Sequence, residues 1–151
     1  MKTGSGFMAA ALAEAAKAAR RGEVPIGAVL VDTRKKQILA ADGNRTRGRM
    51  DPTAHAEMLV IRKAAARAGS ERLTQCDLYV TVEPCPMCAQ AISYARIRRL
   101  YFGAEDEKMG GVIHGPRIFQ SSSCHHRPEV VGGIAGDKAR ALMQDFFKKR
   151  R

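Results

Sequence analysis

The chain has 151 residues, of which 45% are hydrophobic and 27% are charged. This composition argues against collagen, a coiled coil or wholesale disorder, and we expect one globular domain spanning residues 1–151. Lys and Arg number 26 against 15 Asp and Glu, so the net charge is +11, which favours a polyanionic partner, either a nucleic acid or an acidic membrane.

The N-terminal part of the chain predicts a helix followed by two strands. An Ala-rich amphipathic helix is expected over 5–21, with Ser5 as its cap and Gly22 as its end. The apolar run at 26–31 is too short for a helix and rich in β-branched residues, so it predicts a buried strand. A second strand is expected over 37–41.

The middle of the chain predicts two helices, each placed after a strand. A loop at 44–50 leads to a helix expected over 51–68, which Asp-Pro-Thr opens and a glycine closes. A third strand over 77–82 is broken by Glu-Pro, and a third helix is expected over 86–96.

The C-terminal part predicts two more strands and a closing helix. The strands are expected over 99–103 and 129–133, and the stretch 104–128 between them reads mostly as loop, with room for one short helix. The closing helix over 137–150 is amphipathic. Its expected inward residues are Ala139, Leu142, Met143 and Phe146.

Strands separated by helices predict an α/β sandwich, in which helices cover a sheet that is parallel at least in part. In such sheets, ligands bind at the carboxyl ends of the strands. No run of 18 apolar residues is present, so no membrane span is expected. The N-terminal run lacks the features of a signal peptide, so we expect a cytoplasmic location, where paired cysteines favour metal or redox chemistry.

Cys85 and Cys88 are spaced so that both sulfurs can face one point at the start of the third helix. Alone, this pair is typical of a redox dithiol or of half a structural zinc site. His55 begins the second helix and adds a third suitable zinc ligand. Three protein ligands leave one tetrahedral position open, as in catalytic zinc sites.

Glu57 lies two residues after His55 and is a candidate to take a proton from a metal-activated water. A glutamate in the first turn of a helix also has a simpler role, since it stabilises the helix dipole. The dipoles of both helices favour negative charge at these N-termini and therefore favour thiolate ligands.

These residues carry a family resemblance. His55-Ala56-Glu57 together with Pro84-Cys85-Pro86-Met87-Cys88 resembles the signature of the cytidine deaminase-like zinc hydrolases. The segments 23–31, 51–58, 78–85 and 146–151 are similar to those of the bacterial tRNA-specific adenosine deaminases, and the resemblance extends over nearly the whole chain.

The resemblance implies a three-layer α/β/α sandwich with a five-stranded mixed sheet, a homodimer, and conversion of the anticodon wobble adenosine of a tRNA to inosine. It implies that His55, Cys85 and Cys88 bind one Zn²⁺ per chain and that Glu57 shuttles protons. It also places Asn44 against the target nucleoside and the backbone of Ala56 beside the base. No catalytic role is carried into residues 104–128.

Several residues have two interpretations. Asn44 follows a strand and a glycine, where an asparagine is commonly only a turn residue. Cys76 is expected to be a small buried hydrophobe. Cys124-His125-His126 reads as a surface loop or as part of a metal site, and His114 permits no interpretation.

Basic residues near the expected site and at the C-terminus are candidate RNA contacts. The loop arginines Arg45, Arg47 and Arg49 suit phosphate contacts. In the closing helix, Phe146 is expected to pack inward while Phe147 stacks on a nucleotide. The final Lys148, Lys149, Arg150 and Arg151 suit a phosphate clamp, and they also suit a helix C-terminus on electrostatic grounds alone.

Four functions are set against one another. A tRNA adenosine deaminase explains the open zinc position, Glu57 and the charge. A deaminase of cytosine, guanine or a free nucleoside leaves the charge of +11 without a purpose. A zinc-stapled RNA-binding domain leaves Glu57 unexplained, and a redox protein leaves His55 unexplained.

Overall fold

The computed structural model describes residues 4–150 of the chain. Its elements in chain order are α1 (Gly4–Arg20), β1 (Gly27–Asp32), β2 (Gln37–Gly43), α2 (Ala56–Ala68), β3 (Cys76–Val82), α3 (Pro86–Tyr94), β4 (Arg99–Ala104), the 3₁₀ turn η1 (Ile118–Gln120), β5 (Glu129–Val131) and α4 (Gly136–Lys148). No helix among the described residues combines the length and apolar character needed to cross a membrane.

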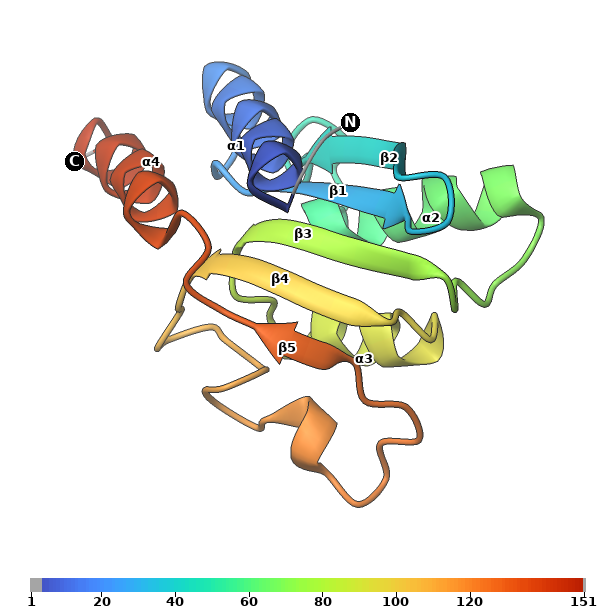
Figure 1. Cartoon of the computed structure of the whole chain (residues 1–151). Coiled ribbons are helices and arrows are strands. Elements are labelled where there is room, and N and C mark those ends of the chain that lie inside the picture. Colours follow the sequence, from blue (N-terminus) through green and yellow to red (C-terminus); the bar gives the residue numbers. More distant parts are fainter. Residues whose placement is uncertain (1–3, 151) are drawn as a thin grey trace.

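The five strands form one mixed sheet in the order β2-β1-β3-β4-β5 (Figure 1). β1 is antiparallel to both of its neighbours, β2 and β3, whereas β3, β4 and β5 run parallel. The predicted five-stranded mixed sheet is therefore confirmed.

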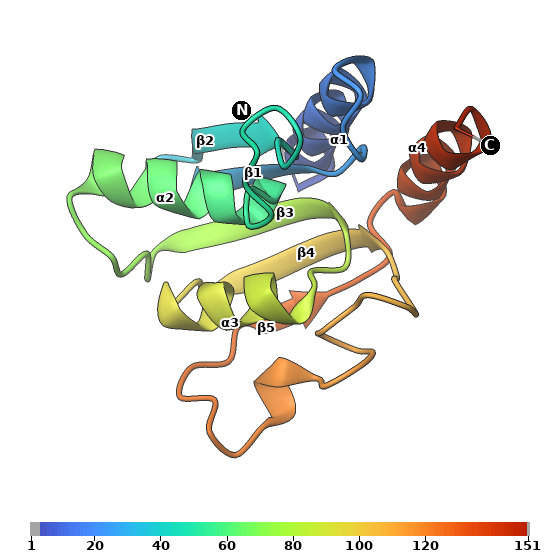
Figure 2. The same cartoon turned by 180° about the vertical axis from the view of Figure 1, so that it is seen from behind.

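Helices cover both faces of the sheet. α1 and α4 lie on one face, and α2 and α3 lie on the other, as the two opposite views show (Figures 1 and 2). The larger core fills the space beneath α2 and α3 and includes Leu30, Leu78 and Phe102. A smaller core beneath α1 includes Met8 and Tyr79. The three-layer α/β/α sandwich is confirmed.

The alanines of α1 allow the helix to pack closely on the sheet. Ala11, Ala15 and Ala18 are fully buried. A Cβ on Gly27 of β1 would lie only 2.0 Å from the carbonyl oxygen of Ala11, so only glycine fits at this crossing.

The structure corrects several predicted boundaries. α2 begins at Ala56 instead of residue 51, because the Asp51 carboxylate accepts hydrogen bonds from both the backbone N–H and the hydroxyl of Thr53 and holds these residues in a turn. α3 ends at Tyr94, before Arg96 adopts a left-handed φ of 62°. β5 ends at Val131, two residues short of Gly133, whose φ is 82°.

Candidate functional site

The N-termini of α2 and α3 meet at one edge of the sheet. β2 and β3 are both antiparallel to β1, so their carboxyl ends lie at the same edge. The connection from β2 leads into α2, and β3 leads into α3. His55 occupies the N-cap position of α2, Cys85 occupies the N-cap position of α3, and Cys88 lies in the first turn of α3. The topology thus brings together residues that are 30 positions apart.

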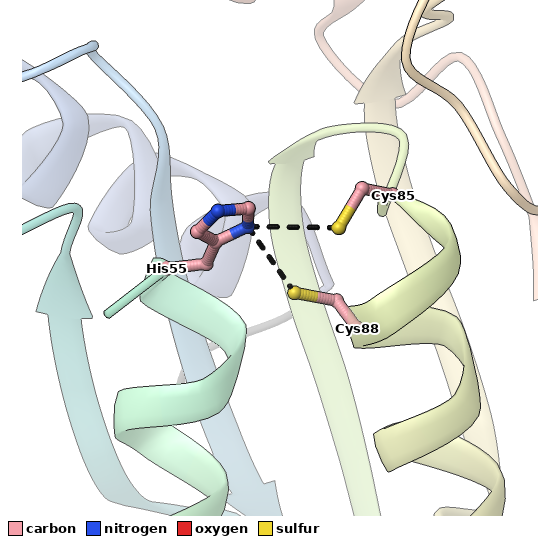
Figure 3. Close-up of side chains that lie close together, drawn as sticks. All are labelled: His55, Cys85 and Cys88. Atoms are coloured by element: carbon pink, nitrogen blue, oxygen red, sulfur yellow. Dashed lines mark hydrogen bonds between the residues drawn. The ribbon is translucent and has the colours of Figure 1, made fainter. Parts of the chain in front are cut away.

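The three predicted metal ligands converge on one point (Figure 3). The His55 Nδ1 lies 3.6 Å from the Sγ of Cys85 and 3.5 Å from the Sγ of Cys88. A tetrahedral zinc ion, with bonds of about 2.0–2.1 Å to nitrogen and about 2.3 Å to sulfur, requires a nitrogen–sulfur separation of about 3.5 Å. All three donor atoms lie within 4.8 Å of one another, and residues 4–150 contain no second such group. The donors fit a metal ion.

The protonation of the two thiols is coupled. Hydrogen bonds from Cys88 and His55 lower the pKa of the Cys85 thiol to about 4. The hydrogen that Cys88 shares with Cys85, together with burial, raises the pKa of Cys88. The hydrogen bond to Cys85 also raises the pKa of His55. The site therefore already favours one thiolate, the form that binds metals.

Glu57 is buried beside these ligands. Its side-chain Oε1 is the one buried polar side-chain atom among the described residues without a hydrogen-bond partner. Burial raises the pKa of this carboxyl to about 7, and the negative charge of Cys85 adds to the shift. An unpartnered buried oxygen is costly, so it indicates a position where a water molecule or a ligand completes the site.

Asn44 follows the last residue of β2 and contacts the start of α2. It is 5% exposed, and its Oδ1 accepts a 2.8 Å hydrogen bond from the backbone N–H of Ala56. This bond caps the first turn of α2 and leaves the side-chain NH₂ free of any partner among the described residues. The structure therefore brings Asn44 and the Ala56 backbone into direct contact.

The three loop arginines differ in their surroundings. The Arg45 Nε lies 2.8 Å from the buried carboxylate of Asp42, which also binds Lys63. Arg47 and Arg49 are exposed. An open pocket of about 650 Å³ is lined by Arg21, Gly22, Glu23, Arg45, Arg47, Gly48 and Arg49.

The C-terminal end of α4 divides its aromatic and basic residues between two hollows. Phe146 is buried, and the Arg150 guanidinium lies 3.7 Å above the centre of its ring, whereas Phe147 is 48% exposed. Phe147 and Lys148 line a hollow with Met143 and Gln144, and Lys149 and Arg150 line another against α1. Leu142 and Met143, predicted to point inward, are only partly buried. Arg151 lies outside the described residues.

The sequence analysis missed the buried carboxylate of Glu83, which holds the segment 105–114 in place. Its oxygens accept hydrogen bonds from the backbone N–H groups of Asp106, Val112, Ile113 and His114, and the His114 Nδ1 lies 2.8 Å away. A Cβ on Gly111 would lie 2.5 Å from the backbone nitrogen of Pro86, so this segment packs directly on the start of α3. The glycine pair and a glutamate before Pro84 were the available signals.

The remaining cysteines have structural surroundings. Cys76 is buried in the larger core, and burial raises its pKa to about 11, in agreement with the predicted hydrophobic role. The Cys124 thiol lies 3.4 Å from the Ser93 hydroxyl. The His126 Nε2 donates to the Ile97 carbonyl at 2.7 Å. This segment is docked on α3 and does not join a metal group in the described part of the chain.

Comparison with known protein sequences shows close relatives. The family model of the MafB19-like deaminases matches residues 4–151. A tRNA-specific adenosine deaminase of Agrobacterium fabrum is 54% identical over 146 residues, covering 96% of this chain and 94% of the relative. One of Bacillus subtilis is 41% identical over 145 residues, covering 96% and 89% of the two chains.

Two solved structures of deaminases also match this chain. A structure from a study of A-to-I editing by tRNA:A34 deaminases matches with a TM-score of 0.87 and 54% identity, covering 90% of this chain and 97% of that one. A guanine deaminase of Nitrosomonas europaea matches with a TM-score of 0.83 at 20% identity, covering 97% and 85%, which shows a shared fold alone.

Proposed function

This chain belongs to the MafB19-like deaminases and to the family of the tRNA-specific adenosine deaminases, and from this premise we propose that it hydrolyses the adenosine at the wobble position of a tRNA anticodon to inosine and ammonia. One observation carries the proposal: His55, Cys85 and Cys88 converge beside the unpartnered Oε1 of Glu57. An open metal position beside a buried proton acceptor is the arrangement that hydrolytic base deamination requires.

We propose that His55, Cys85 and Cys88 hold one Zn²⁺ per chain. The fit of their spacing to tetrahedral zinc and their soft donor set support this choice of metal. When bound, a zinc ion activates water for attack at neutral pH.

Glu57 is proposed to carry the protons. As water adds to C6 of the adenine, the carboxylate accepts the water proton and delivers it to N1. It then moves the proton of the new hydroxyl to the departing amino group. The bond between C6 and the exocyclic nitrogen breaks, and ammonia is released. A pKa of about 7 suits both accepting and donating a proton at neutral pH.

Asn44 and the backbone of Ala56 are proposed to hold the target nucleoside, and the basic and aromatic residues are proposed to hold the RNA around it. The free NH₂ of Asn44 supports its assignment as a donor. The proposed RNA contacts are Arg45, Arg47, Arg49, Phe147, Lys148, Lys149 and Arg150. The family resemblance further supports a single domain of residues 1–151 that acts as a homodimer in the cytoplasm without a membrane partner.

A deaminase of free bases or nucleosides is the main competing function. Its support is the fold shared with guanine deaminase. The net charge of +11 disfavours it, because a small neutral substrate needs no extended cationic surface.

The test is ammonia release from four substrates by the zinc-loaded protein: an anticodon stem-loop with adenosine at the wobble position, free adenosine, cytidine and guanine. The expected result is release from the stem-loop alone, with inosine in the RNA product. Turnover of guanine or a free nucleoside at a comparable kcat/KM would assign the small-molecule function instead. The Glu57→Gln variant is the control for background hydrolysis.

A further inference from the structure

The pocket lined by arginines includes Arg45, the residue that follows Asn44 of the proposed nucleoside site. The Arg21 Nη2 donates a 3.1 Å hydrogen bond to the backbone carbonyl of Asn44. The same arginine lines the 650 Å³ pocket together with Arg45, Arg47 and Arg49. A nucleotide held by Asn44 therefore has its neighbouring phosphates close to this pocket.

The pocket keeps an excess of positive charge. Asp42 pairs with both Arg45 and Lys63, so its single negative charge is shared between two cations. The Glu23 carboxylate is occupied by the backbone N–H groups of Arg47 and Gly48, at 3.1 and 2.7 Å, and so fixes the loop that carries the arginines. Within residues 4–150, the guanidinium groups of Arg21, Arg47 and Arg49 form no ion pair. They are available to an anion.

The positive surface continues from this pocket to α4. Gly22, which also lines the pocket, turns the chain after α1 with a φ of 84°, and a Cβ placed on it would lie 3.6 Å from the Arg150 Nη2. A second hollow of about 270 Å³ between the ends of α1 and α4 is lined by three cations, Arg20, Lys149 and Arg150, and by one carboxylate, Asp145, so its lining is net positive. The end of α1 thus joins the loop arginines to the end of α4.

We infer that the end of α1 is part of the RNA-binding surface, with Arg21 binding a phosphate next to the target nucleotide and Arg20 and Arg150 binding the same RNA farther along. This inference rests on the proposed function and adds α1 to it. It also distinguishes the arginines of the loop: Arg47 and Arg49, which have no ion pair among the described residues, contact the RNA, whereas Arg45 also holds the loop on Asp42. An RNA backbone suits this surface better than a flat lipid layer, because the arginines line concave pockets and Arg21, in the larger one, is hydrogen-bonded to the backbone of Asn44.

The experiment measures binding of a fluorescent anticodon stem-loop to zinc-loaded protein over a range of salt concentrations. The Glu57→Gln background prevents turnover. The test variants are Arg21→Gln, Arg49→Gln and Arg150→Gln. The matched control is Arg34→Gln, because Arg34 is an exposed cation in the turn before β2, at the opposite end of that strand from the pocket.

Each test variant should bind several-fold more weakly and reduce the slope of log K against log salt by about 0.7, the value for one phosphate contact with a single strand. The control should change neither quantity. A trinucleotide centred on the target adenosine should be sensitive to Arg21→Gln but much less to Arg150→Gln.

Arg21 also touches the Asn44 backbone, so Arg21→Lys provides a second check. Lysine keeps the charge and should restore the salt slope that is measured in the Glu57→Gln background. An unchanged slope in Arg21→Gln, with normal binding by the parent, would overturn the inference while leaving the proposed function intact. If Arg21→Gln bound RNA normally but no longer bound anionic lipid vesicles that the parent binds, the surface would be assigned to lipid instead. Failure of the parent protein to bind or deaminate the stem-loop would instead refute the proposed function.

Discussion

Asn44 and Ala56 are joined by a 2.8 Å hydrogen bond from the Ala56 backbone N–H to the Asn44 Oδ1. The bond gives the two ends of the Asn44 amide different tasks. The oxygen satisfies a free N–H at the start of α2, and the NH₂ group is the donor that we propose for the target nucleoside. The two tasks can be separated by substitution.

Asn44→Asp should keep the cap on α2 but lose the donor to the nucleoside, whereas Asn44→Ala should lose both. We expect Asn44→Asp to unfold at nearly the parent temperature with a strongly reduced kcat/KM. Asn44→Ala should lose activity and also about 1–2 kcal/mol of stability. Thermal unfolding and steady-state kinetics measure the two effects, and full activity in Asn44→Asp would exclude the donor role.

Cys88→Ala should remove most of the metal. The Cys88 thiol is fully buried and lies 3.5 Å from the His55 Nδ1, so no other side chain among the described residues can replace it. Metal analysis of purified protein should find one zinc per parent chain and little in the variant. Cys124→Ala is the matched control, because Cys124 lies in the docked segment on α3 and should leave the metal content unchanged. Full zinc retention by Cys88→Ala would show that the site is misplaced.

Glu57→Gln should keep zinc and RNA binding but lose turnover. Glutamine preserves the size of the side chain and cannot accept the water proton. Positioned acid–base groups contribute about 10²–10⁴-fold, and one group serves several transfers here, so a loss near the upper end is expected. Single-turnover kinetics with a stem-loop gives the rate, while metal analysis and RNA binding give the controls. A rate within tenfold of the parent would rule out Glu57 as the shuttle.

The parts that could be predicted from the sequence are those with a local signal. The β-branched run that forms β1 and the amphipathic period of α4 each leave a pattern in consecutive residues. The convergence of His55, Cys85 and Cys88 was predictable because a Cys pair and a His-x-Glu element, each at a helix N-terminus, have the spacing of the donors of an open zinc site with a carboxylate beside it. The three ligands accordingly meet where the topology brings α2 and α3 together.

The parts that were missed depend on contacts between distant segments. The Asp51 carboxylate holds Thr53 in a turn, and the Asn44 side chain, 12 residues before Ala56, accepts the hydrogen bond that caps α2. The start of the helix could therefore not be located from the Asp-Pro-Thr sequence. Glu23 and Glu83 are buried because they bind backbone N–H groups 25 and 29 residues away, at Gly48 and Val112. A single buried glutamate leaves no periodic pattern by which such a contact can be recognised.

The stabilisation that His114 gives should depend on pH. Burial alone would raise the pKa of Glu83, but the hydrogen bonds from His114 and the backbone lower it, and Glu83 in turn raises the pKa of His114. The glutamate contribution is present above its ordinary pKa of 4.5 and is lost as the pH falls through its lowered value. The histidine contribution is present below 6.5 and is lost as the pH rises through its raised value.

The pair should therefore stabilise the fold most between pH 4.5 and 6.5. We expect the difference in melting temperature between the parent and His114→Gln to be largest within this window and to shrink towards pH 8.5. His125→Gln is the control, because His125 is exposed and makes no hydrogen bond among the described residues. A difference independent of pH would mean that His114 acts only as a neutral hydrogen-bond donor.

Phe146 and Phe147 should separate folding from RNA binding in adjacent residues. Phe146 is 7% exposed and lies beneath Arg150, so Phe146→Ala should cost about 3–5 kcal/mol of stability. Phe147 is 48% exposed, so Phe147→Ala should leave the unfolding free energy nearly unchanged.

If Phe147 stacks on a base, its loss should weaken stem-loop binding by about 1–3 kcal/mol, and the salt slope should stay constant because no phosphate contact is removed. Urea unfolding and binding at two salt concentrations measure these effects. Unchanged affinity in Phe147→Ala would remove this residue from the RNA-binding surface, and a changed salt slope would mean that it positions Lys148 instead of stacking.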